Sequence, residues 1–265
     1  DLVRSRGLGD VYKRQATAQP AAPDKLTIGI YAPSVEFGTA QVRLQYAQAL
    51  AKAIEAQTGA KTEAKSFAQF SQLKGSGVDF AIVDGQCYAA NLGWPLLASA
   101  QVGGGTTRAW ALFADGATDM QGLKGKKLAY VQTGCNDNGF IDNAMLDSEV
   151  DAAFFAGRVG KPDITAAVAE VASYKGAAAV FAPVGTQKGL TKIFDTGAVP
   201  NPGFVQMNGK LPAALVDQVA AAVVGFGGGG DDDRGHGQDG DELVHGCSDR
   251  ARTGSRGATI AALGL

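Results

Sequence analysis

Short apolar runs, each ended by a glycine, a proline or a polar residue, alternate along the chain with stretches whose apolar residues recur at helical spacing. Runs of four to eight apolar residues predict strands that are buried on both faces. The clearest run is 78–83, which ends at Asp84-Gly85. The same pattern predicts strands at 26–32, 61–65, 95–102, 108–114, 128–132, 177–182, 190–194 and 204–207.

Helices are predicted between several of these runs. The longest follows the loop 33–38 and ends near Thr58, because its apolar residues form one stripe and Gly59 then stops it as a C-terminal glycine would. Shorter helices are predicted at 67–74 and 86–92, from 139 to 146, and from Pro212 onwards. The order strand–helix–strand–helix–strand at the start predicts parallel strands joined by crossovers.

The two ends of the chain differ from the middle. Residues 1–24 are predicted to be a non-native scar followed by a linker, with a native basic arm as the alternative for the first fifteen. Residues 227–265 replace periodicity with glycine and charge, which predicts a low-complexity or frameshifted tail. His236, His245 and Cys247 lie in that tail, but their spacing fits no known metal pattern, so we expect no metal and no cofactor.

Charge and cysteine content narrow the function classes. A formal net charge of −2 over 265 residues gives no reason to expect nucleic acid or an anionic membrane as a partner. No apolar run approaches the roughly 20 residues that a membrane-spanning helix needs. The three cysteines, Cys87, Cys135 and Cys247, are too few for a disulfide scaffold.

Four segments, 37–59, 78–88, 123–134 and 199–212, occur in an order and at a spacing that carry a family resemblance. Residues 25–226 resemble the phosphate/phosphonate type of periplasmic solute-binding protein, the binding component of an ABC importer. The resemblance implies an α/β fold of the type II periplasmic-binding-protein class, with two Rossmann-like lobes of mostly parallel sheets joined by a two-crossing hinge. Lobe 1 would span 25–104, lobe 2 would span 105–200, and 201–226 would return to lobe 1.

The same resemblance implies a monomer outside the cytoplasm that holds one small polar solute between its lobes and delivers it to a membrane permease. The loops after the strands would supply the contacts, since a loop that ends a strand and opens a helix presents free backbone N–H groups. The predicted ligand-binding residues are Ser34, Phe37, Gly38, Thr39, Asp84, Gln86, Tyr88, Thr133, Gly134, Asn136, Asp137 and Asn138. Helix capping is the alternative role for Thr39 and for Asn136–Asn138, and core packing is the alternative for Phe37 and Tyr88.

The predicted cleft loops depart from the family pattern of Gly-Pro before the aromatic residue and a serine/threonine-rich loop in the second lobe. They carry the carboxylates Glu36, Asp84 and Asp137, with no lysine or arginine among them. This favours a ligand with an ammonium group or a protonated oxyanion over a fully ionised phosphate or phosphonate. The alternative is that these acids cap helices and face solvent.

Two other function classes stay open. Cys135, at a predicted helix start, could be the nucleophile of an enzyme, although both histidines lie in the tail. The same fold could serve as the ligand-sensing domain of a regulator or a sensor kinase. The two-lobe arrangement places Cys87 and Cys135 on opposite cleft walls, where they could form a bridge that locks the lobes if the protein is exported. We expect two unrelated buried thiols instead.

Overall fold

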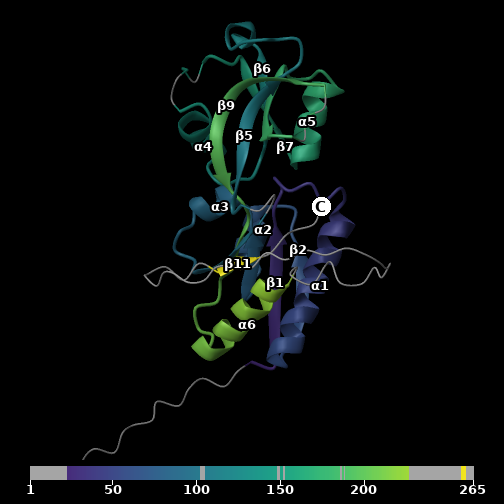
Figure 1. The fold of residues 1–265 in the computed structure, drawn as a ribbon, viewed down its shortest axis with the longest axis vertical. Helices are drawn as coiled ribbons and strands as arrows, with labels where there is room; N and C mark the ends of the chain where they lie inside the picture. The colour runs from purple at the N-terminus through teal and green to yellow at the C-terminus, as the bar shows by residue number, and fades with distance from the viewer. Residues whose placement is uncertain are drawn as a thin grey trace, which may run out of the picture.

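The computed structural model describes residues 23–101, 105–147, 150–151, 153–185, 187 and 189–226, together with the backbone of 258–260. These residues form two α/β lobes, one above the other in Figure 1. A six-stranded sheet in the order β11-β4-β10-β3-β1-β2 forms the centre of lobe 1. A five-stranded sheet in the order β7-β6-β8-β5-β9 forms the centre of lobe 2.

Lobe 1 begins with the strand–helix–strand–helix–strand unit that the sequence predicts. Strands β2 (Lys61–Ser66) and β3 (Phe80–Val83) both pair in parallel with β1 (Lys25–Tyr31). The connecting helices are α1 (Ala40–Thr58) and α2 (Phe70–Gly75). The sheet continues through β10 (Gly203–Gln206), which is antiparallel to β3 and to β4 (Leu96–Ala100), and ends at β11 (Ala258–Ile260), which is parallel to β4.

Helices cover both faces of this sheet. Helix α1 and helix α6 (Ala213–Gly225) pack on one face, with Leu50, Ile54 and Val219 fully buried against the strands. Helix α2 and helix α3 (Gly85–Ala89) contribute Phe70, Leu73 and Cys87 to a smaller core on the other face. This burial explains why the strands are apolar on both sides.

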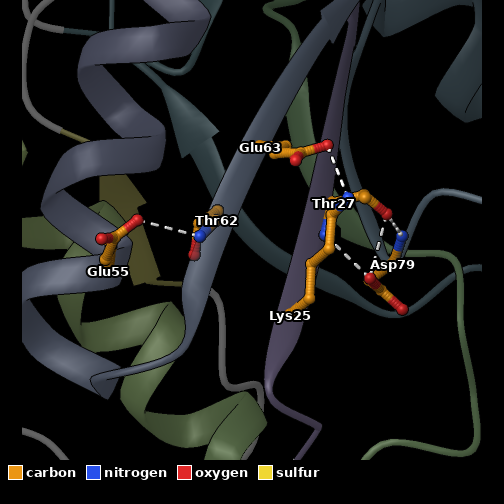
Figure 2. Close-up of polar contacts among 6 residues, drawn as sticks. All are labelled: Lys25, Thr27, Glu55, Thr62, Glu63 and Asp79. Carbon is orange, nitrogen blue, oxygen red and sulfur yellow. Dashed lines mark hydrogen bonds and ion pairs between the residues drawn. The ribbon is translucent and has the colours of Figure 1, made fainter.

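The amino ends of the parallel strands, shown in Figure 2, are joined by polar contacts. The Asp79 carboxylate accepts hydrogen bonds from the Thr27 backbone N–H at 2.8 Å and from its hydroxyl at 3.0 Å, which fixes β3 beside β1. Lys25 pairs with Glu63 across β1 and β2, and Glu55 of α1 accepts from the Thr62 N–H. The candidate site lies beyond the opposite, carboxyl ends of β1 and β3.

Lobe 2 is a mixed sheet flanked by short helices. Strands β7 (Gly157–Lys161) and β8 (Ala179–Pro183) run parallel to β6 (Lys127–Val131). Strand β5 (Thr107–Ala114) is antiparallel to β8 and to β9 (Thr191–Pro200). The helical elements are η1 (Gln121–Leu123), α4 (Asp137–Phe140), the π-helical turn η2 (Ile141–Met145) and α5 (Ile164–Ala172).

The chain crosses between the lobes twice. It leaves β4 of lobe 1 for β5 of lobe 2, and it returns from β9 to β10. Asn201 joins the two crossings, because its side-chain amide donates to the carbonyls of Ala100 at 3.1 Å and Gly105 at 2.9 Å. The two connections are therefore hydrogen-bonded to each other, as expected of a paired hinge.

The predicted fold class is confirmed, with mixed sheets in both lobes. Antiparallel pairs arise where the crossing strands β5, β9 and β10 enter the sheets. Strand β7 and helix α5 are elements that the sequence analysis did not predict. Residues 1–22 and most of the tail, including His236, His245 and Cys247, lie outside the described residues, although 258–260 form β11.

Among the described residues, no helix has the length and apolar character that crossing a membrane requires.

Candidate functional site

A cavity lies between the lobes, beyond the carboxyl ends of β1 and β3. The space between its walls that no protein atom fills is about 490 Å³, and part of that space is open solvent. Both lobes and the hinge contribute to its walls. Its lining residues are Ser34, Asp84, Gly85, Gln86, Arg108, Trp110, Tyr130, Val131, Asp137, Phe140, Ile141, Met145, Phe181, Val199, Pro200 and Pro202.

Asp84 organises the lobe 1 wall. It follows β3 directly and is 2% exposed. Its carboxylate accepts the Ser34 N–H at 3.1 Å and the Gln86 N–H at 3.2 Å, so it joins the ends of β1 and β3 to the start of α3. Burial raises the pKa of Asp84, and these hydrogen bonds and the Arg108 charge offset only part of that rise.

Gly85 allows α3 to lie against the hinge. A Cβ atom at this position would be 2.0 Å from the carbonyl oxygen of Pro200, a distance that no side chain can occupy. Glycine is therefore required where the end of β3 meets the return crossing.

Arg108 and Trp110 face the cavity from lobe 2. They are two residues apart on β5, and so lie on the same face of the strand. The Arg108 Nη2 donates to the carbonyl oxygen of Ser34 at 3.1 Å, across the lobes. Burial lowers the pKa of the Arg108 guanidinium, and the nearby carboxylates of Asp84 and Glu36 oppose that change.

Two N–H donors of this pair have no acceptor. Among the described residues, the buried Nε of Arg108 and the buried Nε1 of Trp110 have no hydrogen-bond partner, and Trp110 is only 5% exposed. Leaving a buried donor unpaired costs about 1–3 kcal/mol, so an acceptor placed between these groups would be stabilised. The predicted cleft loops carry no lysine or arginine, but the structure adds Arg108 to the cavity wall from a strand.

Asp137 is held by its own loop and by the other lobe. Its carboxylate accepts from the Thr133 N–H at 3.0 Å, the Thr133 hydroxyl at 2.5 Å and the Gly134 N–H at 3.0 Å. The Gln86 Nε2 of lobe 1 donates to the same carboxylate at 2.9 Å. With four donors already bound, Asp137 mainly fixes the loop, and it has little capacity left for an ammonium ligand.

A disulfide joins Cys87 of α3 in lobe 1 to Cys135 of lobe 2, with a Cα–Cα distance of 5.0 Å. The expectation of two separate thiols is therefore wrong; the bridge, given above as the alternative, is present. Sequence spacing could not settle this, because the two cysteines meet only when the lobes close. As a disulfide sulfur, Cys135 has no thiol to act as a nucleophile.

Other contacts also hold the lobes together around the cavity. The Tyr31 hydroxyl, whose pKa burial raises, donates to the Thr133 carbonyl at 2.9 Å. The Gln86 Nε2 donates to the Cys135 carbonyl at 3.2 Å, and the Ile164 N–H donates to Pro33 at 3.0 Å. The structure is thus a closed arrangement of the two lobes.

The structure brings four of the twelve predicted site residues to the central cavity: Ser34, Asp84, Gln86 and Asp137. The other eight are not among the residues that line it. Phe37, Gly38 and Thr39 border a separate hollow beside α1, where Phe37 packs on Tyr46 and the Thr39 hydroxyl caps the helix by accepting the Val42 N–H.

The remaining predicted residues lie on the lobe interface or away from it. Thr133 and Gly134 line another inter-lobe hollow, and Tyr88 packs beside the smaller core of lobe 1. Asn136 takes a left-handed conformation (φ 59°) at the start of α4, and Asn138 accepts a hydrogen bond from Arg158.

The sequence analysis missed most of the lobe 2 wall. Its residues lie within strands and helical turns: Arg108, Trp110, Tyr130, Val131, Phe140, Ile141, Met145 and Phe181. Burial raises the pKa of Tyr130, which agrees with its place in this wall. The one available signal was Arg108, a charged residue in a strand that is otherwise apolar.

No protein-family model and no curated protein sequence matches this chain. Solved structures match its fold. The binding-protein component of an ABC phosphonate transporter from Pseudomonas aeruginosa has a TM-score of 0.59 and 12% identity, over 78% of this chain and 76% of the other. PhnD1 from Prochlorococcus marinus, in complex with methylphosphonate, has a TM-score of 0.58 and 11% identity, over 76% and 84%.

A third match is a protein from Xanthomonas citri bound to ATP, with a TM-score of 0.54 and 13% identity over 76% of this chain and 83% of the other. Likeness at such low identity concerns the fold. The chain therefore has the type II periplasmic-binding-protein fold, as its resemblance in sequence predicts, and its structural neighbours include binding components of ABC transporters.

Proposed function

We propose that this protein is the extracytoplasmic solute-binding component of an ABC importer. It takes one small solute into the cavity between its lobes and delivers it unchanged to a membrane permease. The observation that carries the proposal is the cavity itself, which both lobes line beside a two-crossing hinge. Binding components of ABC transporters among the structural neighbours support the same function.

Binding would work by bridging the lobes. A solute that contacts Ser34 or Gln86 of lobe 1 together with Arg108 or Trp110 of lobe 2 is bound fully only when the lobes are closed. Within the range of opening that the Cys87–Cys135 disulfide permits, such a solute shifts the population toward the closed form because it has higher affinity for that form. A permease can then distinguish loaded from empty protein by shape.

A location outside the cytoplasm is supported by the disulfide between Cys87 and Cys135. Disulfides persist in oxidising compartments such as the periplasm and are rare where thiols are kept reduced.

Of the two solute types that the sequence favours, a protonated oxyanion such as a phosphonate monoanion is favoured over an amine. The unpaired donors of Arg108 and Trp110 need an acceptor. Asp137, one of the carboxylates expected to attract an amine, already accepts four hydrogen bonds.

The test is a thermal-shift screen of the purified chain, followed by calorimetry of each hit. The screen would contain phosphate, phosphite, alkylphosphonates, sulfonates, carboxylates, aminophosphonates and small amines. A specific ligand at 100 times its dissociation constant should add about 2.7 kcal/mol to the free energy of unfolding. Lys25→Gln, at the far end of lobe 1, is the matched control and should bind as the wild type does. If no compound of any class binds, the proposal is wrong.

A further inference from the structure

We infer that the solute is a small organic monoanion, with an oxyanion head bound by Arg108 and Trp110 and an apolar body held against the lobe 2 wall. This inference rests on the proposed function and names the chemical class of its ligand. It excludes inorganic phosphate, dianions and free amines as the preferred solute.

The head is assigned from the two unpaired donors. The Arg108 Nε and the Trp110 Nε1 are both buried, both belong to residues of the cavity wall, and both lie on the same face of β5. Acceptors on the lobe 1 side of the cavity already bind other donors, since Ser34 O accepts from Arg108 Nη2 and the Asp84 carboxylate accepts two backbone N–H groups. An oxyanion head, which offers several acceptor oxygens, would supply the acceptors that these two donors lack.

The charge of the head follows from the groups around it. Within the part of the chain that the structure describes, Arg108 is the only lysine or arginine that lines the cavity, whereas Asp84 and Asp137 both line it. A monoanion is matched by the one guanidinium. A dianion would bring a second negative charge into a buried space that already holds two carboxyl groups and no further cation.

The apolar body of the solute is inferred from the side chains with which lobe 2 lines the cavity. Phe140, Ile141, Met145 and Phe181 present aromatic, aliphatic and thioether surface to the cavity. All but Phe140 are nearly fully buried. A bare oxyanion would leave this surface without contact, whereas an alkyl or aryl group would pack on it.

Calorimetry at pH 8 with straight-chain carboxylates of two to seven carbons tests the body. Affinity should rise about fourfold for each added methylene until the cavity is full. Butylsulfonate and butylphosphonate, compared at pH 9.5, test the charge of the head, because the tails are identical and only the phosphonate is largely dianionic at that pH. The sulfonate should bind at least tenfold more tightly. Pentanoate should likewise bind more tightly than its 2-amino counterpart and more tightly than pentylamine.

Two variants test the residues that bind the head. Trp110→Phe removes the N–H but keeps the ring, and Arg108→Gln removes the charge; each should weaken every anion about tenfold or more while the increment per methylene is unchanged. Glu63→Gln, on the far edge of the lobe 1 sheet, is the control and should leave affinities unchanged. Should Arg108→Gln fail to fold, Trp110→Phe alone decides the assignment.

The outcomes separate this inference from the proposed function. If phosphate, a dianion, an amine or a zwitterion binds more tightly than every organic monoanion, the ligand class is overturned and the solute-binding function stands. Unchanged affinity in both variants would overturn the placement of the head. Binding of no compound at all would refute the proposed function.

Discussion

Asp84 shows how one buried carboxyl can organise a site through hydrogen bonds to the protein itself. It joins two strand ends through the backbone N–H groups of Ser34 and Gln86. The sequence placed it correctly at the end of a buried strand. The sequence could not reveal that the carboxylate accepts hydrogen bonds from the protein itself, since these bonds depend on where the loop that carries Ser34 folds.

Replacing Asp84 by asparagine should lower the free energy of unfolding by about 1–3 kcal/mol, because the amide nitrogen cannot accept and one buried N–H loses its partner. Since burial raises the pKa of Asp84 in the folded protein, the folded state holds the proton more tightly. Asp84 therefore contributes its full stabilisation of the folded protein below about pH 4, the pKa of an aspartic acid in the unfolded chain. This contribution is lost as the pH rises toward and through the higher pKa that Asp84 has in the folded protein.

The measurement is urea unfolding of the wild type and Asp84→Asn between pH 3.5 and 8. The difference in unfolding free energy between the two should shrink as the pH rises. A difference that grows with pH would show that the carboxylate is stabilised in its charged form instead.

At the scale of elements, predictability followed burial. Strands buried on both faces, such as β1 and β3, and the capped helix α1 were predicted from periodicity and end signals. Strand β7 was missed because Gly157–Lys161 is only partly buried and carries a single large apolar residue. The C-terminal half of β9, beyond 194, was missed because its sequence is small and polar.

The contact between α3 and the hinge is the element-scale feature that most constrains the site. Gly85→Ala should lower the free energy of unfolding by about 1–3 kcal/mol and weaken ligand binding, because the new methyl would displace α3 from Pro200. Gly75→Ala in α2, where an added Cβ meets nothing within 4 Å, is the matched control and should be close to neutral. Thermal unfolding and calorimetry of both variants would measure this; equal effects would contradict the account.

For the whole molecule, the main new feature is that the lobes are covalently joined on the side of α3. The binding lobes and the hinge followed from the resemblance, but the lobe 2 wall and the disulfide did not. Both depend on how the lobes approach each other, which local patterns of sequence do not record. Arg108 and Trp110 were hidden for the same reason, since they appear in the sequence as part of a core strand.

The disulfide makes two measurable predictions at this scale. Because it links residues 48 positions apart, replacing both cysteines by serine should lower the free energy of unfolding by about 2–4 kcal/mol. Thiol counting on the unfolded, unreduced protein should find only Cys247 of the three cysteines. Three free thiols would contradict the bridge.

Loss of the disulfide should also speed ligand exchange, since the lobes could then separate more widely. Stopped-flow dissociation of a bound anion should be faster in the double serine variant than in the oxidised wild type. Identical dissociation rates in the two proteins would contradict this prediction, because they would show that the disulfide does not limit how far the lobes separate when the ligand leaves.

The central claim is that a solute is held between the lobes by groups from both. Its most direct test is one calorimetric titration of the tightest ligand from the screen into the wild type and into Trp110→Phe. We expect one site per chain, and affinity at least tenfold weaker in the variant. One-site binding of the same strength in both proteins would show that the Trp110 N–H of lobe 2 does not bind the solute, and would contradict its placement between Trp110 and lobe 1.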